Sequence, residues 1–212
     1  MSKKACSIVV LFALGACGAP AIDRSEVSSE ALSPAQLPAP PMVGSKFVFC
    51  VGKNDSETCV RDTIEVLSVA DDGCITEAGS EGEYTICPSI GPGFHAVRWS
   101  GPAFGTGSRS YTDKEGSVWP LTVGGRYSFS EKGESDRHGQ WTNNGSMRVI
   151  GVERLTVPAG TFDTYRIEIS SGQNRYVQLN YAPEIERVVF WHRRHRRDGD
   201  DPARYLAEII EP

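Results

Sequence analysis

The 212-residue sequence lacks an apolar run long enough to cross a membrane. Its N-terminal apolar stretch, Ile8 to Leu14, is far short of the roughly 20 residues that a transmembrane helix needs. The chain also lacks an excess of positive charge, since 27 acidic residues outnumber 22 lysines and arginines. This mildly acidic balance argues against nucleic acid as a partner and predicts no broad attraction to anionic lipid head groups.

Beyond residue 42 the sequence also lacks a sustained apolar stripe with the 3.6-residue period of an amphipathic helix. Apolar and polar residues alternate instead, most cleanly in residues 164–169 and 177–181. A period of two is typical of antiparallel strands with one face in a core and the other in water. The sequence therefore predicts an all-β fold, in which a curved antiparallel sheet forms a barrel-like or β-sandwich meander.

The N-terminus has the parts of an export signal. Lys3 and Lys4 precede the apolar stretch, which ends in Leu14-Gly15-Ala16-Cys17. A short apolar core followed by small residues is typical of a cleaved signal peptide. The Leu, two small residues and Cys resemble the bacterial lipobox, and the resemblance implies cleavage before Cys17 and lipid, including palmitate, on its thiol. A plain secretory signal with a chance cysteine at its boundary is the alternative.

This resemblance also implies a division of the chain and a location. Residues 1–16 would be a lipoprotein signal peptide, and residues 17–42, with five prolines among Ala, Ser and Glu, a flexible tether. Residues 43–212 would form a single β domain large enough for its own core. Gly18, and not an acidic residue, follows Cys17. In lipoproteins of two-membrane bacteria this implies the outer membrane, with the domain facing the periplasm or the cell surface.

Four cysteines lie within the predicted domain: Cys50, Cys59, Cys74 and Cys87. An even number of cysteines in an exported chain favours disulfides. Three pairings are open, and we favour Cys50–Cys59 and Cys74–Cys87 because each pair flanks a turn-rich stretch. The spacings contain no Cys-x-x-Cys knuckle, so a zinc site is the weaker alternative and we expect no bound metal.

Turn-forming residues separate the predicted strands, at 71–73, 143–145, 158–160 and 198–200. The Asn-Gly pair at 144–145 predicts a tight hairpin, because a type I′ turn needs positive φ at both central residues. A weak internal repeat further predicts two similar halves. Residues 43–49 align with 123–129, and residues 66–69 align with 149–152. Strand–turn–strand units also resemble one another without duplication, and that alternative stays open.

The segment Val157-Pro158-Ala159-Gly160-Thr161-Phe162, followed later by Tyr181-Ala182-Pro183-Glu184, resembles a segment of uncharacterised bacterial envelope lipoproteins. The match covers roughly residues 120–192 and implies a curved, barrel-like sheet in the cell envelope. It carries no catalytic residues. Turn chemistry also explains the motif, because Pro158 sets its own φ and Gly160 tolerates a positive one. Phe162 is expected to anchor the core, or alternatively to form a pocket rim with Tyr181.

Motifs for enzyme chemistry are lacking. No Gly-x-Ser-x-Gly elbow occurs, and no pair of carboxylates stands out for sugar hydrolysis. Residues 91–96 mimic the glycine-rich dinucleotide motif, but Pro92 removes an N–H and the following sequence reads as strand. We therefore expect no enzyme activity and no cofactor.

Residues 192–197, His-Arg-Arg-His-Arg-Arg, form the most basic segment of the chain. Three aspartates follow within residues 198–201, so the simplest interpretation is a solvated hairpin tip with balanced charges. The alternative is an anion contact in which arginines bind carboxylate or phosphate groups of lipids or wall polymers. The arginines concerned are Arg193, Arg194, Arg196 and Arg197. A metal site at His192 and His195 is disfavoured, because neighbouring arginines repel a cation.

The four tryptophans, Trp99, Trp119, Trp141 and Trp191, are dispersed and are expected to pack in the core or at sheet edges. If the sheet curls, aromatic side chains could instead line an apolar cavity. The sequence thus predicts a membrane-anchored, non-enzymatic binding or scaffold module whose partner is an envelope protein, a wall polymer or a lipid. The alternative is a carrier of an apolar ligand or lipid in a barrel-like cavity.

Overall fold

The computed structural model describes residues 22–28, 32–52, 59–93, 96–102, 104–172, 175–195 and 199–212. Within these residues the chain is almost entirely β-strand, and its helical content is one 3-10 turn, η2 (Pro88–Ile90). The strands are β1 (Asp23–Glu26), β2 (Lys46–Gly52), β3 (Val60–Val69), β4 (Ile75–Gly79), β5 (Gly82–Ile86), β6 (Arg98–Gly101), β7 (Gly105–Glu115), β8 (Arg126–Ser135), β9 (Gly139–Val157), β10 (Gly160–Ser171), β11 (Arg175–Ala182), β12 (Arg187–His195), β13 (Gly199–Asp200) and β14 (Ala203–Ile210). The predicted all-β class is confirmed.

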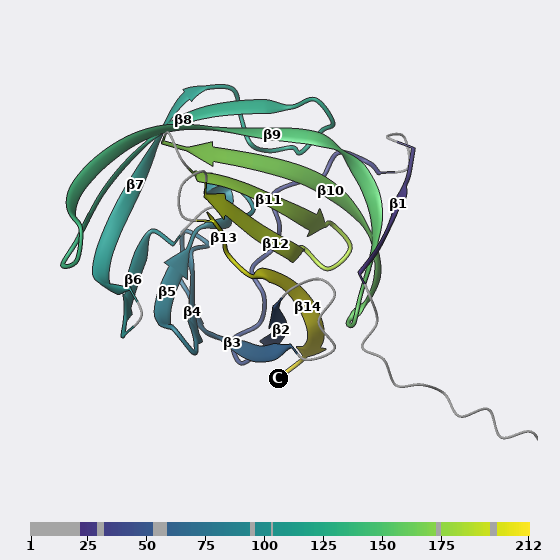
Figure 1. Ribbon diagram of the computed structural model, residues 1–212, viewed down its shortest axis with the longest axis horizontal. Coiled ribbons are helices and arrows are strands. Elements are labelled where there is room, and N and C mark those ends of the chain that lie inside the picture. Colours follow the sequence, from purple (N-terminus) through teal and green to yellow (C-terminus); the bar gives the residue numbers. More distant parts are fainter. Residues whose placement is uncertain are drawn as a thin grey trace, which may run out of the picture.

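Twelve of the described strands form a closed antiparallel barrel. Their order runs from β9 through β10, β11, β12, β14 and then β2 to β8, and the ring closes because β8 also pairs with β9 (Figure 1). Closure gives each described strand of the ring a paired neighbour on both sides. β13 pairs with β12 beside the ring, and β1 pairs with residues 153–156 of β9, beyond the part that β8 covers.

The internal repeat in the sequence coincides with a repeat of hydrogen bonds. In each half a glycine donates its N–H to a valine carbonyl, and the N–H of that valine donates to the residue after the glycine. These bonds are Gly44 to Val66 (2.9 Å) and Val66 to Ser45 (3.0 Å), matched by Gly124 to Val149 (2.9 Å) and Val149 to Gly125 (3.0 Å). The ring accordingly divides into six strands from β2 to β7 and six from β8 to β14 without β13. This agreement favours two similar halves over chance likeness.

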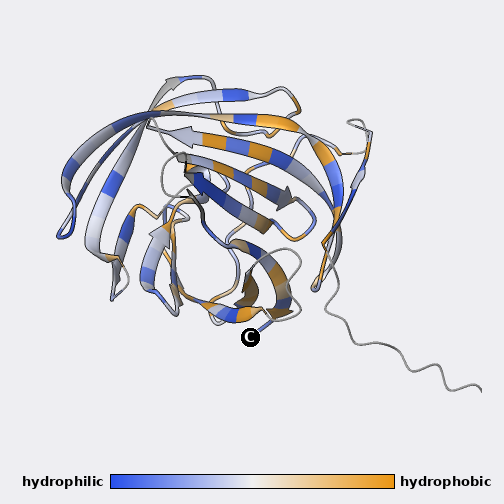
Figure 2. Ribbon diagram, in the orientation of Figure 1, coloured by the Kyte–Doolittle hydropathy of each residue, from blue (hydrophilic) through white to orange (hydrophobic). Residues whose placement is uncertain are grey.

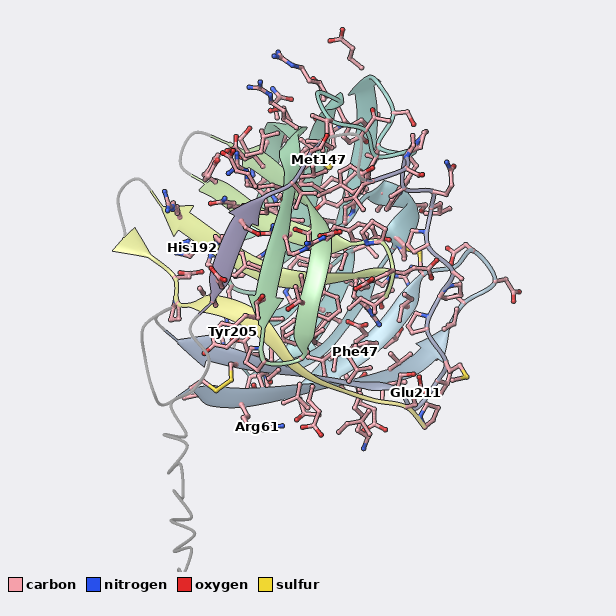
Figure 3. All side chains as sticks on the ribbon, turned by 90° about the vertical axis from the view of Figure 1, so that its right-hand side faces the viewer. Phe47, Arg61, Met147, His192, Tyr205 and Glu211 are labelled. Atoms are coloured by element: carbon pink, nitrogen blue, oxygen red, sulfur yellow. A yellow bond between two sulfur atoms is a disulfide. The ribbon has the colours of Figure 1, made fainter. Side chains whose placement is uncertain are left out.

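Alternating side chains build the core from both halves. Figure 2 shows apolar and polar residues alternating along β10 and β11, as the sequence predicts. One buried cluster contains Tyr127, Phe129, Met147, Val149, Ile167 and Leu179, and the other contains Phe47, Val66, Ile75, Leu155, Phe162 and Leu206. Met147 and Phe47, one from each cluster, lie at different heights within the barrel (Figure 3). Phe162 is therefore a core residue, as expected.

Both disulfides have the favoured pairing, Cys50 with Cys59 and Cys74 with Cys87. The predicted turns at 71–73 and 158–160 join β3 to β4 and β9 to β10, respectively. β11 ends at Ala182, directly before Pro183, because proline cannot donate to a β ladder. Residue 198 of the last predicted turn lies outside the described residues, and Gly199–Asp200 forms β13.

The hairpin predicted at Asn144-Gly145 is wrong. β9 runs without interruption from Gly139 to Val157, and the chain reverses before it, at residues 136–138. A β-carbon on Gly145 would lie 2.2 Å from the Phe129 ring and 2.4 Å from the carbonyl oxygen of Ser170. Glycine is therefore needed here for close packing inside the barrel wall, and not for a turn.

The segment predicted to be a tether contacts the barrel over its described residues. β1 pairs with β9, and Arg24 forms an ion pair with Glu153. Farther along, Ala35 and Leu121 exchange backbone hydrogen bonds of 3.1 and 2.8 Å. The Tyr165 hydroxyl donates to the carbonyl of Ser33 at 2.8 Å. Residues 22–28 and 32–42 thus belong to the folded unit, whereas Cys17 and the signal segment lie outside the described residues.

Candidate functional site

A cavity of about 850 Å³ lies inside the barrel. Barrel diameter grows with strand number, and about eight strands already give an interior that side chains just fill. A twelve-strand ring is wider than that, so its interior stays partly hollow. The volume falls within the range of small-molecule binding sites, about 300–1,000 Å³.

Aromatic side chains dominate the apolar part of the cavity wall. They are Phe47, Phe49, Tyr84, Trp99, Phe104, Trp119, Trp141, Tyr181 and Trp191, and the aliphatic residues beside them include Ile64, Ile75, Ile86 and Val188. All four tryptophans of the chain are in this set, and each is only half-buried. Trp119 and Trp191 also pack against the buried cluster around Tyr127, as expected for the core, and all four tryptophans line the cavity, which was the alternative. Of the proposed rim pair, Tyr181 lines the cavity and Phe162 lies in the core instead.

Two neighbouring hairpin tips border the cavity. Phe104, at the tip joining β6 to β7, lines the cavity and is 47% exposed. Arg137, at the tip joining β8 to β9, donates to the carbonyl of Pro102 at 2.7 Å. The N-terminal segment contributes to the wall through residues 38–41, held by a 3.1 Å hydrogen bond from the N–H of Ala39 to Glu186.

An ion pair crosses the barrel interior between Glu77 on β4 and Arg187 on β12. Its closest atoms, Glu77 Oε1 and Arg187 Nη1, lie 3.0 Å apart. Three strands, β14, β2 and β3, separate β12 from β4 around the ring, so the pair spans the lumen. The Arg187 guanidinium lies over the Phe47 ring on β2, 3.9 Å from its centroid. Glu77 is only 4% exposed.

A second ion cluster joins β14 to β3. Arg204 contacts Asp62 at 3.1 Å and Glu81 at 3.0 Å. Asp62 also accepts hydrogen bonds from the N–H of Ser80 (3.1 Å) and its hydroxyl (2.7 Å). The Asp62 carboxylate is therefore well supplied with donors, as a buried charge must be.

A third cluster lies on the opposite wall, around Glu131 on β8. Glu131 is 1% exposed and accepts hydrogen bonds from Arg109 (3.1 Å), from the indole N–H of Trp141 (3.0 Å) and from the hydroxyl of Ser171 (3.0 Å). The Arg109 guanidinium lies 4.8 Å from the Trp99 ring centroid and 5.8 Å from that of Trp141. Cation–π contacts of this kind strengthen when water is excluded.

Three buried polar atoms in the cavity wall have no hydrogen-bond partner among the described residues: Glu77 Oε1, Arg187 Nη2 and Arg109 Nε. Glu77 Oε1 and Arg187 Nη1 form an ion pair at 3.0 Å, without a hydrogen bond of good geometry between them. The lumen-crossing pair is thus the part of the cavity whose polar groups are least satisfied.

Burial raises the pKa of several groups in the cavity wall. It raises the pKa of Glu77, against the opposing charge of Arg187. Burial, together with Glu77 and Asp62, raises the pKa of Tyr84 far above its usual value. Burial and Glu186 do the same for the pKa of Tyr181. Both phenols therefore remain uncharged hydrogen-bond donors at neutral pH.

Of the described residues of the basic segment, 192–195, Arg193 reaches the cavity. Arg193 lines the cavity, pairs with Asp201 at 2.6 Å and lies 5.1 Å from the Trp191 ring centroid. One aspartate thus balances one arginine, as expected for this hairpin. Arg194 is exposed, and residues 196–197 lie outside the described residues. The anion contact stays a prediction.

The sequence analysis missed the interior charges Asp62, Glu77, Arg109, Arg187 and Arg204. A partial signal exists for Glu77, which lies between Ile75 and Gly79 on the inward face of β4. A charged residue on an otherwise apolar face needs a partner, but the strand pattern does not say which distant strand supplies it.

The described parts of the chain lack two further features. Nowhere in them do three or more His, Cys, Asp or Glu side chains gather in a way that could hold a metal ion. Nor do these parts include a helix of the length and apolar character required to span a membrane.

Two solved structures are similar to this chain. One, from Bacteroides fragilis, is described as an exported protein with a YmcC-like fold. It is 10% identical, with a TM-score of 0.42 over 84% of this chain and 100% of that one. The other, from Parabacteroides distasonis, is described as a lipoprotein and is 12% identical, with a TM-score of 0.41 over the same shares. A scan against protein-family models and a search of curated proteins found no match. Similarity this low supports no inference about function, so the proposals below rest on the cavity.

Proposed function

We propose that this protein binds a small molecule with an apolar body inside its barrel and serves as a non-enzymatic carrier or receptor at the cell envelope. The observation behind this proposal is the cavity of about 850 Å³ with its aromatic lining. A cavity that is mostly apolar and carries a few convergent polar groups is the usual form of a small-molecule site. Transfer of an apolar body from water into such a space is favourable, by roughly 25 cal/mol per Å² of surface.

The proposed location is the outer membrane, with Cys17 carrying the lipid. The lipobox-like N-terminus supports this, because a lipid-bearing cysteine anchors a folded domain without a spanning helix. Binding inside the barrel would then occur close to a membrane surface, the natural source of apolar ligands.

Replacing Cys17 by alanine is expected to abolish palmitate labelling and to change the membrane fractionation of the protein. Cys6, within the predicted signal peptide, provides a matched control, and Cys6→Ala should change neither. Unchanged labelling and fractionation of the Cys17→Ala protein would show that the anchor assignment is wrong.

The cavity is tested first by its natural contents. Residues 18–212, which include every described residue, would be exported to an oxidising compartment and purified without detergent. An organic extract is then analysed by mass spectrometry beside an unrelated exported protein. A selectively enriched hydrophobe in stoichiometric amount is the expected result. A clean extract, combined with no uptake of an apolar probe, would move the search to protein or wall partners.

The tryptophans offer a direct measure of occupancy. Because all four line the cavity, an apolar fluorophore such as N-phenyl-naphthylamine should quench their emission by energy transfer when it binds inside. Ile86→Gln places a polar group in the cavity wall and should weaken probe binding about tenfold, the loss expected when apolar contact of this size is removed. Val60→Gln, at a position 72% exposed, is the matched control and should leave binding unchanged.

A further inference from the structure

The lumen-crossing pair of Glu77 and Arg187 combines an unpartnered acceptor with an unpartnered donor. Among the described residues, neither Glu77 Oε1 nor Arg187 Nη2 has a hydrogen-bond partner, and both side chains line the cavity. Arg187 Nη2 shares its carbon with Nη1, which lies 3.0 Å from Glu77 Oε1. The donor and the acceptor are therefore close together, and because neighbouring atoms cover both of them, one small group bonds to both once the pair turns toward the cavity.

The charge of this pair restricts what that group can be. A carboxylate or phosphate would be drawn to Arg187 but repelled by Glu77 beside it, and an ammonium group would meet the reverse. The Phe47 ring covers one face of the guanidinium, and the Glu77 carboxylate lies 3.0 Å from its Nη1 atom. A neutral group meets no repulsion from either side chain.

The other interior clusters provide no comparable position. Asp62 already accepts hydrogen bonds from Ser80 and Arg204, and Glu131 accepts three. Arg109 has one unpartnered atom, Nε, but its guanidinium lies against two tryptophan rings and its carboxylate partner is already satisfied. The pair on β4 and β12 thus differs from the others in needing both a donor and an acceptor.

We propose that the ligand has a neutral polar end, a hydroxyl or a carboxamide, which binds at Glu77 and Arg187. Its oxygen accepts a hydrogen bond from Arg187 Nη2, and its O–H or N–H donates one to Glu77 Oε1. Its apolar body lies against the aromatic wall. This assignment rests on the proposed function, since it presumes that a ligand enters the barrel. It specifies the ligand class as neutral amphiphiles, distinct from fatty acids, anionic lipids and amines.

The test uses four ligands that share one alkyl chain and differ only at the end: a primary alcohol, a primary carboxamide, a carboxylic acid and an amine. Each displaces N-phenyl-naphthylamine from residues 18–212 at neutral pH. The alcohol and the amide should bind at least about tenfold more tightly than the charged ligands. Equal affinity of all four would overturn the assignment and leave ligand binding itself intact. Failure of the probe to bind at all would instead count against the proposed function.

Two variants separate charge from folding. Glu77→Gln leaves Arg187 as an uncompensated cation, so the preference should move from the alcohol to the carboxylic acid. The double variant Glu77→Gln/Arg187→Gln is neutral again and retains both a donor and an acceptor, so the preference for the alcohol should return. Glu208→Gln, whose side chain is 50% exposed, is the control for loss of a carboxylate and should match the parent. If the Glu77→Gln protein still binds the probe and its order of affinities for the four ligands is unchanged, the assignment is also overturned.

Discussion

Replacing Glu131 by glutamine is expected to lower the free energy of unfolding by about 3–5 kcal/mol, the usual cost of removing one partner from a buried ion pair. The carboxylate is 1% exposed, and the side chain of its partner Arg109 is 11% exposed. Glutamine has nearly the same volume and can still bond to Trp141 and Ser171. The main loss is therefore the charge that compensates Arg109 on the neighbouring strand β7.

Urea unfolding followed by tryptophan fluorescence measures this change, because Trp141 donates directly to Glu131. Glu134→Gln, on the same strand but exposed, is the control and should change stability by less than about 0.5 kcal/mol. A Glu131→Gln protein as stable as this control would mean that Arg109 does not need the carboxylate for its burial.

Replacing Gly145 by alanine is expected to cost about 1–3 kcal/mol, as overpacking of a tight interior does. The new β-carbon would lie 2.2 Å from the Phe129 ring and 2.4 Å from the carbonyl of Ser170. The ring can turn, but the carbonyl belongs to β10 and moves only if the two strands separate. The substitution therefore acts on the pairing of β9 with β10.

Gly151 is the matched control, because it lies on the same strand and a β-carbon there meets nothing within 4 Å. Gly151→Ala should leave stability unchanged or raise it by about 0.4–1 kcal/mol, since alanine restricts the unfolded chain. Thermal and urea unfolding of both variants measure these changes in stability. If the two substitutions have equal effects, close packing at residue 145 is not the reason for its glycine.

Local patterns predicted much of this fold. The alternation in residues 164–169 and 177–181 became β10 and β11, and the proline–glycine turn at 158–160 joins β9 to β10. The disulfide pairing was also predictable, because each bond joins cysteines that flank a single hairpin loop. In each case the residues that decide the outcome are close along the chain, the two cysteines of a disulfide being 9 or 13 residues apart.

The predictions that failed depend instead on residues that are far apart in the sequence. Asn144-Gly145 has the local chemistry of a hairpin, yet Phe129 and Ser170 from neighbouring strands determine its conformation. Residues 22–42 have the composition of a linker, but Arg24 finds a buried carboxylate at Glu153, far along the chain. A local pattern contains no information about such a distant neighbour.

The sequence by itself predicted the all-β class, the strands around residues 164–169 and 177–181, two of the four proposed turns and the favoured disulfide pairing, because alternation and turn chemistry act between near neighbours. Only the tertiary structure decided that β8 meets β9 to close a ring of twelve strands, and therefore that the interior is hollow. It alone placed Glu77 3.0 Å from Arg187 and brought four dispersed tryptophans into the wall of one cavity. A buried charge needs a partner, and Glu77 and Arg187 become partners only because closure of the barrel brings their strands together across the interior.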